Sequence, residues 1–118
     1  MTFQKDPVIP LRHILQSIRL IERRLKDVTF EEFDDNIDLQ DMTVRRIEIV
    51  GEAVRRLEKN FKDKYPEIKW RKPADMRNIL IHEYDDIKWK VVWDTAKEDI
   101  PILKKQIKEL LKQLKSKT

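Results

Sequence analysis

The chain contains a single glycine, Gly51, in 118 residues. Glycine is the residue that adopts positive φ without steric cost, so tight turns that need this conformation are nearly excluded here. Leucine, isoleucine, glutamate, lysine and arginine, all adequate or good helix formers, dominate instead. The sequence therefore predicts an all-α fold, and its length predicts one domain that spans residues 1–118.

Three long stretches carry apolar residues at steps of three and four, the pattern of an amphipathic helix. The first follows Pro10 and places on one face Leu11, Ile14, Leu15, Ile18, Ile21, Leu25 and Val28. The second begins near Asp38 or Asp41, ends at Tyr65 and Pro66, and buries Leu39, Met42, Ile47, Val50, Val54, Leu57 and Phe61. The third follows a cap at Asp85 or Asp86 and buries Trp89, Val92, Trp93, Ala96, Ile100, Leu103, Ile107, Leu110 and Leu114.

Local signals refine this pattern. Thr29 and Glu32 fit a capping box for a short helical turn. Pro73 suits the first turn of a further helix, and Pro101 is expected to kink or split the last one. Gly51 lies in the middle of the second long helix, where it costs about 1 kcal/mol relative to alanine, so it indicates close contact with another helix. Short connections between such helices predict a four or five helix up-and-down bundle.

Composition narrows the class of protein. The chain has 26 Lys and Arg against 22 Asp and Glu, so its net charge of +4 permits an anionic partner without requiring one. It has no cysteine, which excludes disulfides and thiolate metal sites and suits a reducing compartment. No apolar run approaches the roughly 20 residues of a spanning helix, and the N-terminus lacks the order of a signal peptide. We expect a soluble, cytoplasmic protein that makes no membrane contact.

The segment RNILIHEY, residues 77–84, combines residues that suit a chemical site. Arg77 and His82 lie about 140° apart on a helix, so they line one broad polar face rather than touch. Asn78 and His82, four positions apart, are stacked neighbours. If two copies pack these helices together, both pairs converge on a shared groove, which predicts a composite site in a homodimer.

The residue types in this segment favour RNA cleavage without a metal or other cofactor. Histidine, with an ordinary pKa of about 6.5, moves protons in both directions near neutral pH. Arginine grips phosphate and stabilises charge on it. Arg77 and His82 are therefore the candidate catalytic residues; Asn78 orients the imidazole or a phosphate oxygen, and Tyr84 offers a hydroxyl at the rim.

Neighbouring residues allow less specific interpretations. The basic cluster before the motif is a candidate RNA contact and consists of Lys69, Arg71 and Lys72. A histidine on a helix is more often a surface or packing residue than a catalyst, and Tyr84 suits an interface as well as a modification site. The tryptophans beside the apolar stripes, Trp70, Trp89 and Trp93, are expected in the core rather than stacked on bases. For the pair Asp85 and Asp86, a helix cap fits better than a metal site, because further ligands are lacking.

Arg77, Asn78, His82 and Tyr84 together resemble the R-x4-H-x-Y signature of the HepT-like toxins, a branch of the HEPN superfamily of helical ribonucleases. The segments IEIVGEAVRRL, YPEIKW and VVWDTAKEDIPILKKQI resemble that family too, so the likeness covers almost the whole chain. It departs at Glu83, where glycine is common in the family.

The resemblance implies an α-helical, HEPN-like bundle that dimerises. It also implies the toxin of a type VII toxin–antitoxin system, a metal-independent endoribonuclease that uses Arg77 and His82 with Asn78 as a polar helper. The implied partner is a small nucleotidyltransferase antitoxin that silences the toxin by attaching AMP to Tyr84.

Three classes of function fit these residues. The first is the ribonuclease toxin. The second is a non-catalytic subunit that binds a nucleotide or serves as scaffold in a nucleotidyltransferase complex, with Arg77 on phosphate. The third is a structural helical dimer, which does not require the coincidence of Arg77, Asn78 and His82. That coincidence favours the first class over the third and leaves the second open.

Overall fold

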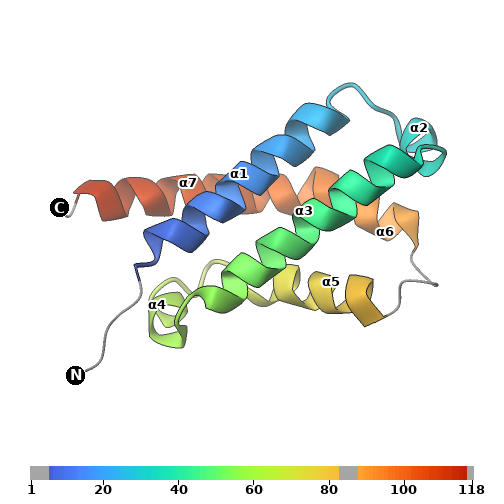
Figure 1. The fold of residues 1–118 in the computed structure, drawn as a ribbon. Helices are drawn as coiled ribbons and strands as arrows, with labels where there is room; N and C mark the ends of the chain where they lie inside the picture. Colours follow the sequence, from blue (N-terminus) through green and yellow to red (C-terminus); the bar gives the residue numbers. More distant parts are fainter. Residues whose placement is uncertain (1–5, 83–87, 117–118) are drawn as a thin grey trace.

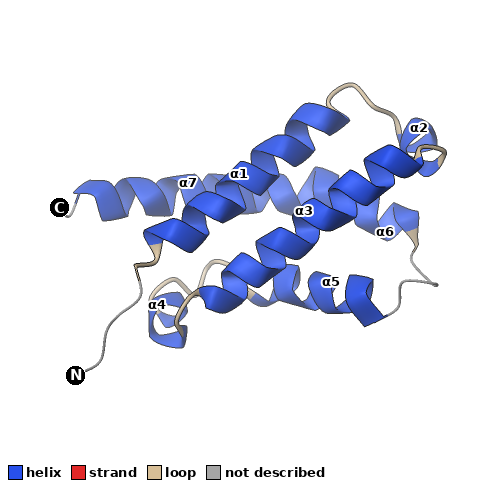
Figure 2. Ribbon diagram, in the orientation of Figure 1, coloured by secondary structure: helices blue, strands red, loops and turns tan. Residues whose placement is uncertain are grey.

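The computed structural model describes residues 6–82 and 88–116, and every regular element within these ranges is a helix (Figures 1 and 2). In chain order the elements are α1 (Val8–Leu25), α2 (Phe30–Asp34), α3 (Ile37–Arg56), α4 (Lys59–Asp63), α5 (Arg71–His82), α6 (Trp89–Asp94), the π-helix η2 (Thr95–Asp99) and α7 (Ile100–Ser116). The predicted all-α bundle is confirmed. None of the helices in these ranges combines the length and the apolar content needed to cross a membrane.

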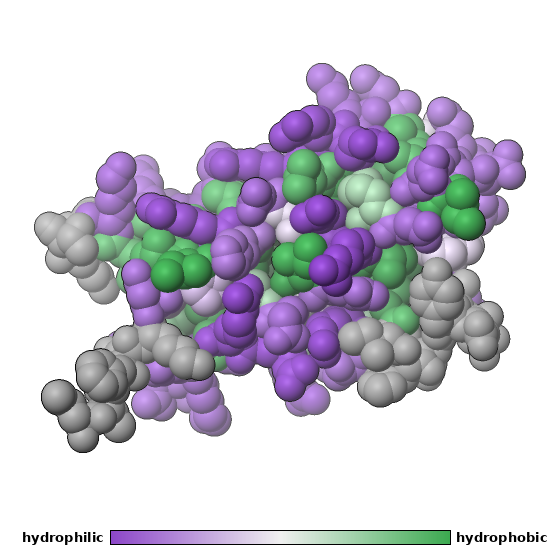
Figure 3. Space-filling model, in the orientation of Figure 1, coloured by the Kyte–Doolittle hydropathy of each residue, from purple (hydrophilic) through white to green (hydrophobic). Residues whose placement is uncertain are grey.

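Helix α3 occupies the centre of the bundle. It packs against α1 on one side and α5 on the other, and α1 also crosses α7 (Figure 1). The elements α6, η2 and α7 follow one another without a break and form a rod behind α1 and α3 (Figure 1). The face over α1 and α3 is covered mainly by hydrophilic side chains, with apolar ones visible between them (Figure 3). Because α5 is attached mainly to α3, the position of its side chains depends on that single helix pair.

Buried apolar side chains form two clusters along α1 and α3. One joins the first half of α1 and the second half of α3 to α7, and the other joins the remaining halves to Phe33, Leu80 and Val92. Phe33 is fully buried, and its ring centroid lies 5.2 Å from that of Trp93 and 6.2 Å from that of Trp89. Trp70 is 9% exposed. Trp70 therefore lies in the core as expected, while Trp89 and Trp93 are partly buried and pack against the second cluster.

The predicted capping box at the start of α2 is present. The backbone N–H of Glu32 donates to Thr29 Oγ1 at 3.2 Å, and the backbone N–H of Thr29 donates to Glu32 Oε1 at 3.3 Å. Just before this box the chain turns at Asp27, whose φ of 61° lies in the left-handed region. Aspartate tolerates this conformation better than most residues, so the turn forms without glycine.

Several predicted helix ends were wrong. Helix α1 begins at Val8, before Pro10, and ends at Leu25, which leaves Val28 outside it. Helix α3 begins at Ile37 with Asn36 as its N-cap, and it ends at Arg56 rather than at Tyr65. Residues 59–63 form the separate helix α4. The expected cap at Asp85 or Asp86 falls outside the described residues; α6 begins at Trp89.

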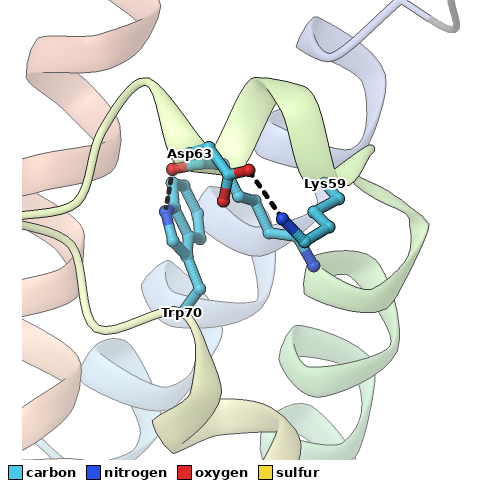
Figure 4. Close-up of polar contacts among 4 residues, drawn as sticks. Lys59, Asp63 and Trp70 are labelled. Carbon is cyan, nitrogen blue, oxygen red and sulfur yellow. Dashed lines mark hydrogen bonds and ion pairs between the residues drawn. The ribbon is translucent and has the colours of Figure 1, made fainter.

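The break between α3 and α4 has a tertiary cause. Leu57 adopts an extended conformation (φ −72°, ψ 136°) and stays 4% exposed, so its side chain remains in the core while the backbone turns. Trp70 Nε1 donates to the backbone oxygens of Lys62 in α4 and of Tyr65 just after it, each at 3.2 Å. Figure 4 shows the Trp70 indole against this helix. The Lys59–Asp63 contact of 2.9 Å links both ends of α4, and this hydrogen bond to Asp63 raises the pKa of Lys59 (Figure 4).

The expected kink or split at Pro101 is not seen as a break, because α6, η2 and α7 are contiguous and Pro101 lies in the first turn of α7. The π-helix η2 ends two residues before it, and the backbone N–H of Ile100 donates to the oxygen of Thr95, five residues back. The side chain of Lys97 in η2 donates to the backbone oxygen of Leu25 at 2.9 Å. This contact joins the π-helix to the end of α1.

Candidate functional site

Helix α5 carries the residues that the sequence singles out. It begins at Arg71, places Pro73 in its first turn as predicted, and ends at His82. Arg77 is partly buried and Asn78 is exposed. The side chain of His82 lies outside what the structure describes, as do Tyr84 and the rest of residues 83–87. Among the proposed catalytic residues, Arg77 is therefore the one whose side-chain contacts the structure gives.

Gly51 allows α5 to approach α3 closely. A Cβ atom at position 51 would lie 2.7 Å from the backbone oxygen of Pro73 and 2.8 Å from Cβ of Arg77. Both distances are shorter than real Cβ contacts, so any larger residue would push α5 away. The predicted close helix contact is confirmed, and it seats the stem of Arg77 directly on Gly51.

The next residue of α3 holds the other end of the same side chain. Glu52 Oε2 lies 3.2 Å from Arg77 Nη2, and the side chains of Arg77 and Glu52 are 21% and 48% exposed. Glu52 Oε2 also lies 3.8 Å from Nη1 of Arg55, three positions along α3. The contact with Glu52 involves one terminal nitrogen of Arg77. A guanidinium group carries five N–H donors, so it can contact a carboxylate and a phosphate together.

Arg77 lines a surface depression of about 340 Å³ between α3 and α5. The other lining residues are Arg45, Glu48, Ile49, Glu52 and Arg56. Three arginines against two glutamates leave this surface with an excess of positive charge, which favours an anionic ligand.

Two of these charges have partners of their own. Arg45 Nη1 lies 3.7 Å from Glu48 Oε2. Arg56 Nη2 lies 3.0 Å from Nδ1 of His13, the second histidine of the chain, which α1 brings to this region. Sequence periodicity did not point to Glu52 or Arg56, because Glu52 contacts Arg77, and Arg56 lines the same depression, only when α3 and α5 pack together. The one available signal was the position of Glu52 beside Gly51.

The basic cluster before α5 lies elsewhere. Lys69 and Lys72 line a second depression, of about 390 Å³, whose floor is apolar and comes partly from α7. Lys72 Nζ lies 3.4 Å from Asp99 Oδ1. Arg71 is exposed. Among the residues that the structure describes, none lines both depressions, so this basic cluster and Arg77 border separate surfaces. Within residues 6–82 and 88–116, no three metal-ligating side chains (His, Cys, Asp or Glu) lie close enough to hold an ion.

Residues 14–110 match the sequence family described as Ribonuclease HepT-like. The chain is 44% identical over 111 residues to a gamma-glutamylcyclotransferase and candidate RNase of Methanocaldococcus jannaschii; the match covers 94% of this chain and 50% of the relative, so the chain spans about half of its length. It is 40% identical over 111 residues to a candidate RNase of Caldanaerobacter subterraneus subsp. tengcongensis, which covers 94% of the chain and 99% of that relative. A "Probable ribonuclease HepT" of Thermococcus cleftensis is 41% identical over 102 residues, 86% of the chain and 93% of that relative. No solved structure matches the chain at significant similarity.

Proposed function

Because the chain belongs to the HepT-like family of ribonucleases, we propose that it is a metal-independent endoribonuclease, the toxin of a type VII toxin–antitoxin system. Arg77 and His82 are its catalytic residues, and Asn78 is their polar helper. The observation that supports this most is the seat of Arg77: its stem packs on Gly51, and Glu52 contacts one terminal nitrogen at 3.2 Å. An arginine so restrained at the surface suits a fixed phosphate better than a solvated side chain does.

The proposed reaction is an internal transesterification of RNA. His82 accepts the proton of a ribose 2′-OH, and the oxygen attacks the adjacent phosphorus. The bond from phosphorus to the 5′-oxygen breaks, and that oxygen takes up a proton from the medium or from a second imidazole. The products are a 2′,3′-cyclic phosphate and a 5′-OH end. Arg77 stabilises the negative charge that builds up on the phosphate oxygens.

The active unit in this proposal is a homodimer. Five positions at 100° per residue separate Arg77 and His82 by about 140° on an ideal helix, so a single helix is expected to present them in different directions. A second copy of α5 across a two-fold axis would place His82 of one protomer beside Arg77 of the other. The exposure of the Asn78 side chain on α5 supports this arrangement.

The proposal includes a partner protein that inhibits the ribonuclease. A nucleotidyltransferase partner attaches AMP to Tyr84, two positions after His82 and therefore close to the groove. The AMP adds bulk and a negative phosphate where RNA must bind, so it inhibits without unfolding the protein. The alternative is a non-catalytic subunit of a nucleotidyltransferase complex in which Arg77 contacts a bound nucleotide.

The direct test is RNA cleavage in the presence of EDTA. The wild-type protein should cut single-stranded or structured RNA and leave 2′,3′-cyclic phosphate ends. Arg77→Ala and His82→Ala should each reduce the rate by about 100-fold or more while the helical circular dichroism stays unchanged. His13→Gln, a change of the other histidine, serves as the matched control and should keep the activity. Intact RNA together with tight nucleotide binding by the wild-type protein would support the alternative instead.

The same two variants test whether the site is shared. Equal amounts of Arg77→Ala and His82→Ala are mixed so that the protomers exchange. If each site takes Arg77 from one protomer and His82 from the other, half of the dimers are mixed and each mixed dimer has one intact site of two. The mixture should therefore recover about a quarter of the wild-type activity. Sedimentation of the mixture should show dimers. Inactivity in mixed dimers would show that both residues act within one protomer.

A further inference from the structure

Arg77 is restrained at two points by successive residues of α3. Its Cβ lies so close to position 51 that a Cβ there would be 2.8 Å away, and its Nη2 lies 3.2 Å from Glu52 Oε2. An arginine side chain has several rotatable bonds and loses much conformational freedom when it is fixed. The contact with Gly51 fixes the start of the side chain, and the contact with Glu52 fixes its end.

The contact between Glu52 and Arg77 is not explained by fold stability. Ion pairs as exposed as this one contribute little to stability, and Glu52 already has a partner on its own helix in Arg55, at 3.8 Å. The carboxylate nevertheless lies closer to Arg77, which comes from another helix. Glu52 also costs RNA affinity, because it places a negative charge beside a surface that would bind phosphate.

We propose that Glu52 is a positioning residue for Arg77 and that it holds the guanidinium plane in the orientation that meets the scissile phosphate. This inference rests on the proposed ribonuclease function. Glu52 contacts one terminal nitrogen of Arg77, so other N–H donors of the guanidinium remain to bind a phosphate. Arginine and carboxylate stay charged throughout, and no proton moves between them.

Positioning and simple electrostatics predict opposite results when Glu52 is replaced. If its charge only repels RNA, its removal should strengthen binding and speed cleavage. If it orients Arg77, its removal should strengthen binding or leave it unchanged but lower kcat, because the transition state loses a well-aligned donor.

The experiment compares Glu52→Ala and Glu52→Gln with wild type in single-turnover and steady-state cleavage of one RNA oligonucleotide. Glu52→Ala should lower kcat about tenfold with an equal or lower KM. Glu52→Gln keeps the size of the side chain and an oxygen that can lie beside Arg77 Nη2, so it should lose only about threefold. Arg55→Gln, which removes the other partner of Glu52, is the matched control and should retain wild-type kcat. Circular dichroism and the urea midpoint show whether each variant is folded. If Glu52→Ala is not folded, the kcat of the isosteric variant Glu52→Gln tests the positioning role instead.

A second arm tests whether Glu52 acts through Arg77. Lysine at position 77 keeps the charge but lacks the planar fork, so in an Arg77→Lys background Glu52→Ala should lower the residual kcat by less than about twofold. Wild-type kcat in Glu52→Ala, or an equal loss in both backgrounds, overturns the positioning role while the function stands. If Arg77→Ala itself cleaves RNA at the wild-type rate, the proposed function fails, and the failure is distinguishable from that of the positioning role.

Discussion

Gly51 has no side chain, and this absence lets Arg77 of α5 lie directly against α3. Its helix contact could be predicted, because a glycine in the middle of a helix is unfavourable unless something lies close to it. The contacting helix could not be predicted, since a periodic pattern shows which face is buried and not what covers it. The identity of Glu52 as a partner of Arg77 depends on that same packing and was therefore missed.

Replacing Gly51 with alanine should damage activity more than stability. Alanine favours the helix by about 1 kcal/mol, but its Cβ would lie 2.7 Å from a backbone oxygen of α5, and such overpacking costs about 1–3 kcal/mol. We expect a small net loss in the free energy of unfolding, measured by urea denaturation, and a loss of RNA cleavage of at least about tenfold because Arg77 moves with α5. Asp41→Ala, an exposed change on the same helix, should alter neither quantity. Unchanged cleavage in Gly51→Ala would show that the seat of Arg77 is not needed.

Some helix ends are set by neighbouring residues, and others depend on residues far away in the sequence. Thr29 and Glu32 lie three residues apart, so the sequence alone predicted their capping box. The end of α3 depends on the burial of Leu57, and the end of α4 receives a hydrogen bond from the distant side chain of Trp70. Such contacts form only in the complete tertiary structure. The apolar periodicity continues past Arg56, so the sequence predicted one helix that runs on to Tyr65.

The end of α1 depends on a distant side chain as well, and this dependence can be measured. Lys97 donates to the backbone oxygen of Leu25 at 2.9 Å, and its Nζ lies 4.9 Å from the centre of the Trp93 ring. Lys97→Met keeps most of the aliphatic stem but removes the donor and the charge at a helix C-terminus. The free energy of unfolding should fall by about 1–2 kcal/mol. Lys112→Met, on α7 of the same rod, is the control and should change it by less than about 0.5 kcal/mol. Equal effects of the two variants would exclude the contact with Leu25 as the cause.

At the scale of the whole molecule, α5 is a peripheral helix held mainly by α3. Asn78 is exposed on this helix, and the proposed function assigns the same face to the second protomer, to RNA and to the antitoxin. The motif predicts which residues of α5 belong to this surface, and that prediction stays untested, because a single chain does not hold the second copy that would complete the groove. Occupation of the surface by one partner should therefore exclude another.

Co-expression with a minimal nucleotidyltransferase tests that exclusion. Intact mass measurement should show added multiples of one AMP unit on the wild-type protein, and the modified protein should no longer cut RNA because the added phosphate repels the substrate. Tyr84→Phe should lack the added mass and remain an active ribonuclease. Tyr65→Phe, a change of the chain's other tyrosine, should be modified as the wild type is. Persistence of the mass shift in Tyr84→Phe, or full activity of the modified protein, would rule out Tyr84 as the switch.

The π-helix at residues 95–99 has a consequence for how chains of this kind tolerate changes in length. Because the backbone N–H of Ile100 reaches back five residues instead of four, one extra residue is accommodated inside a helix and no loop is needed. Deleting one residue in this turn would restore the ordinary repeat and leave the two flanking apolar stripes in their present orientations. A length difference between homologous chains at this point therefore represents a conservative event in the middle of a helix, where an insertion or deletion would otherwise rotate half of the rod away from its core.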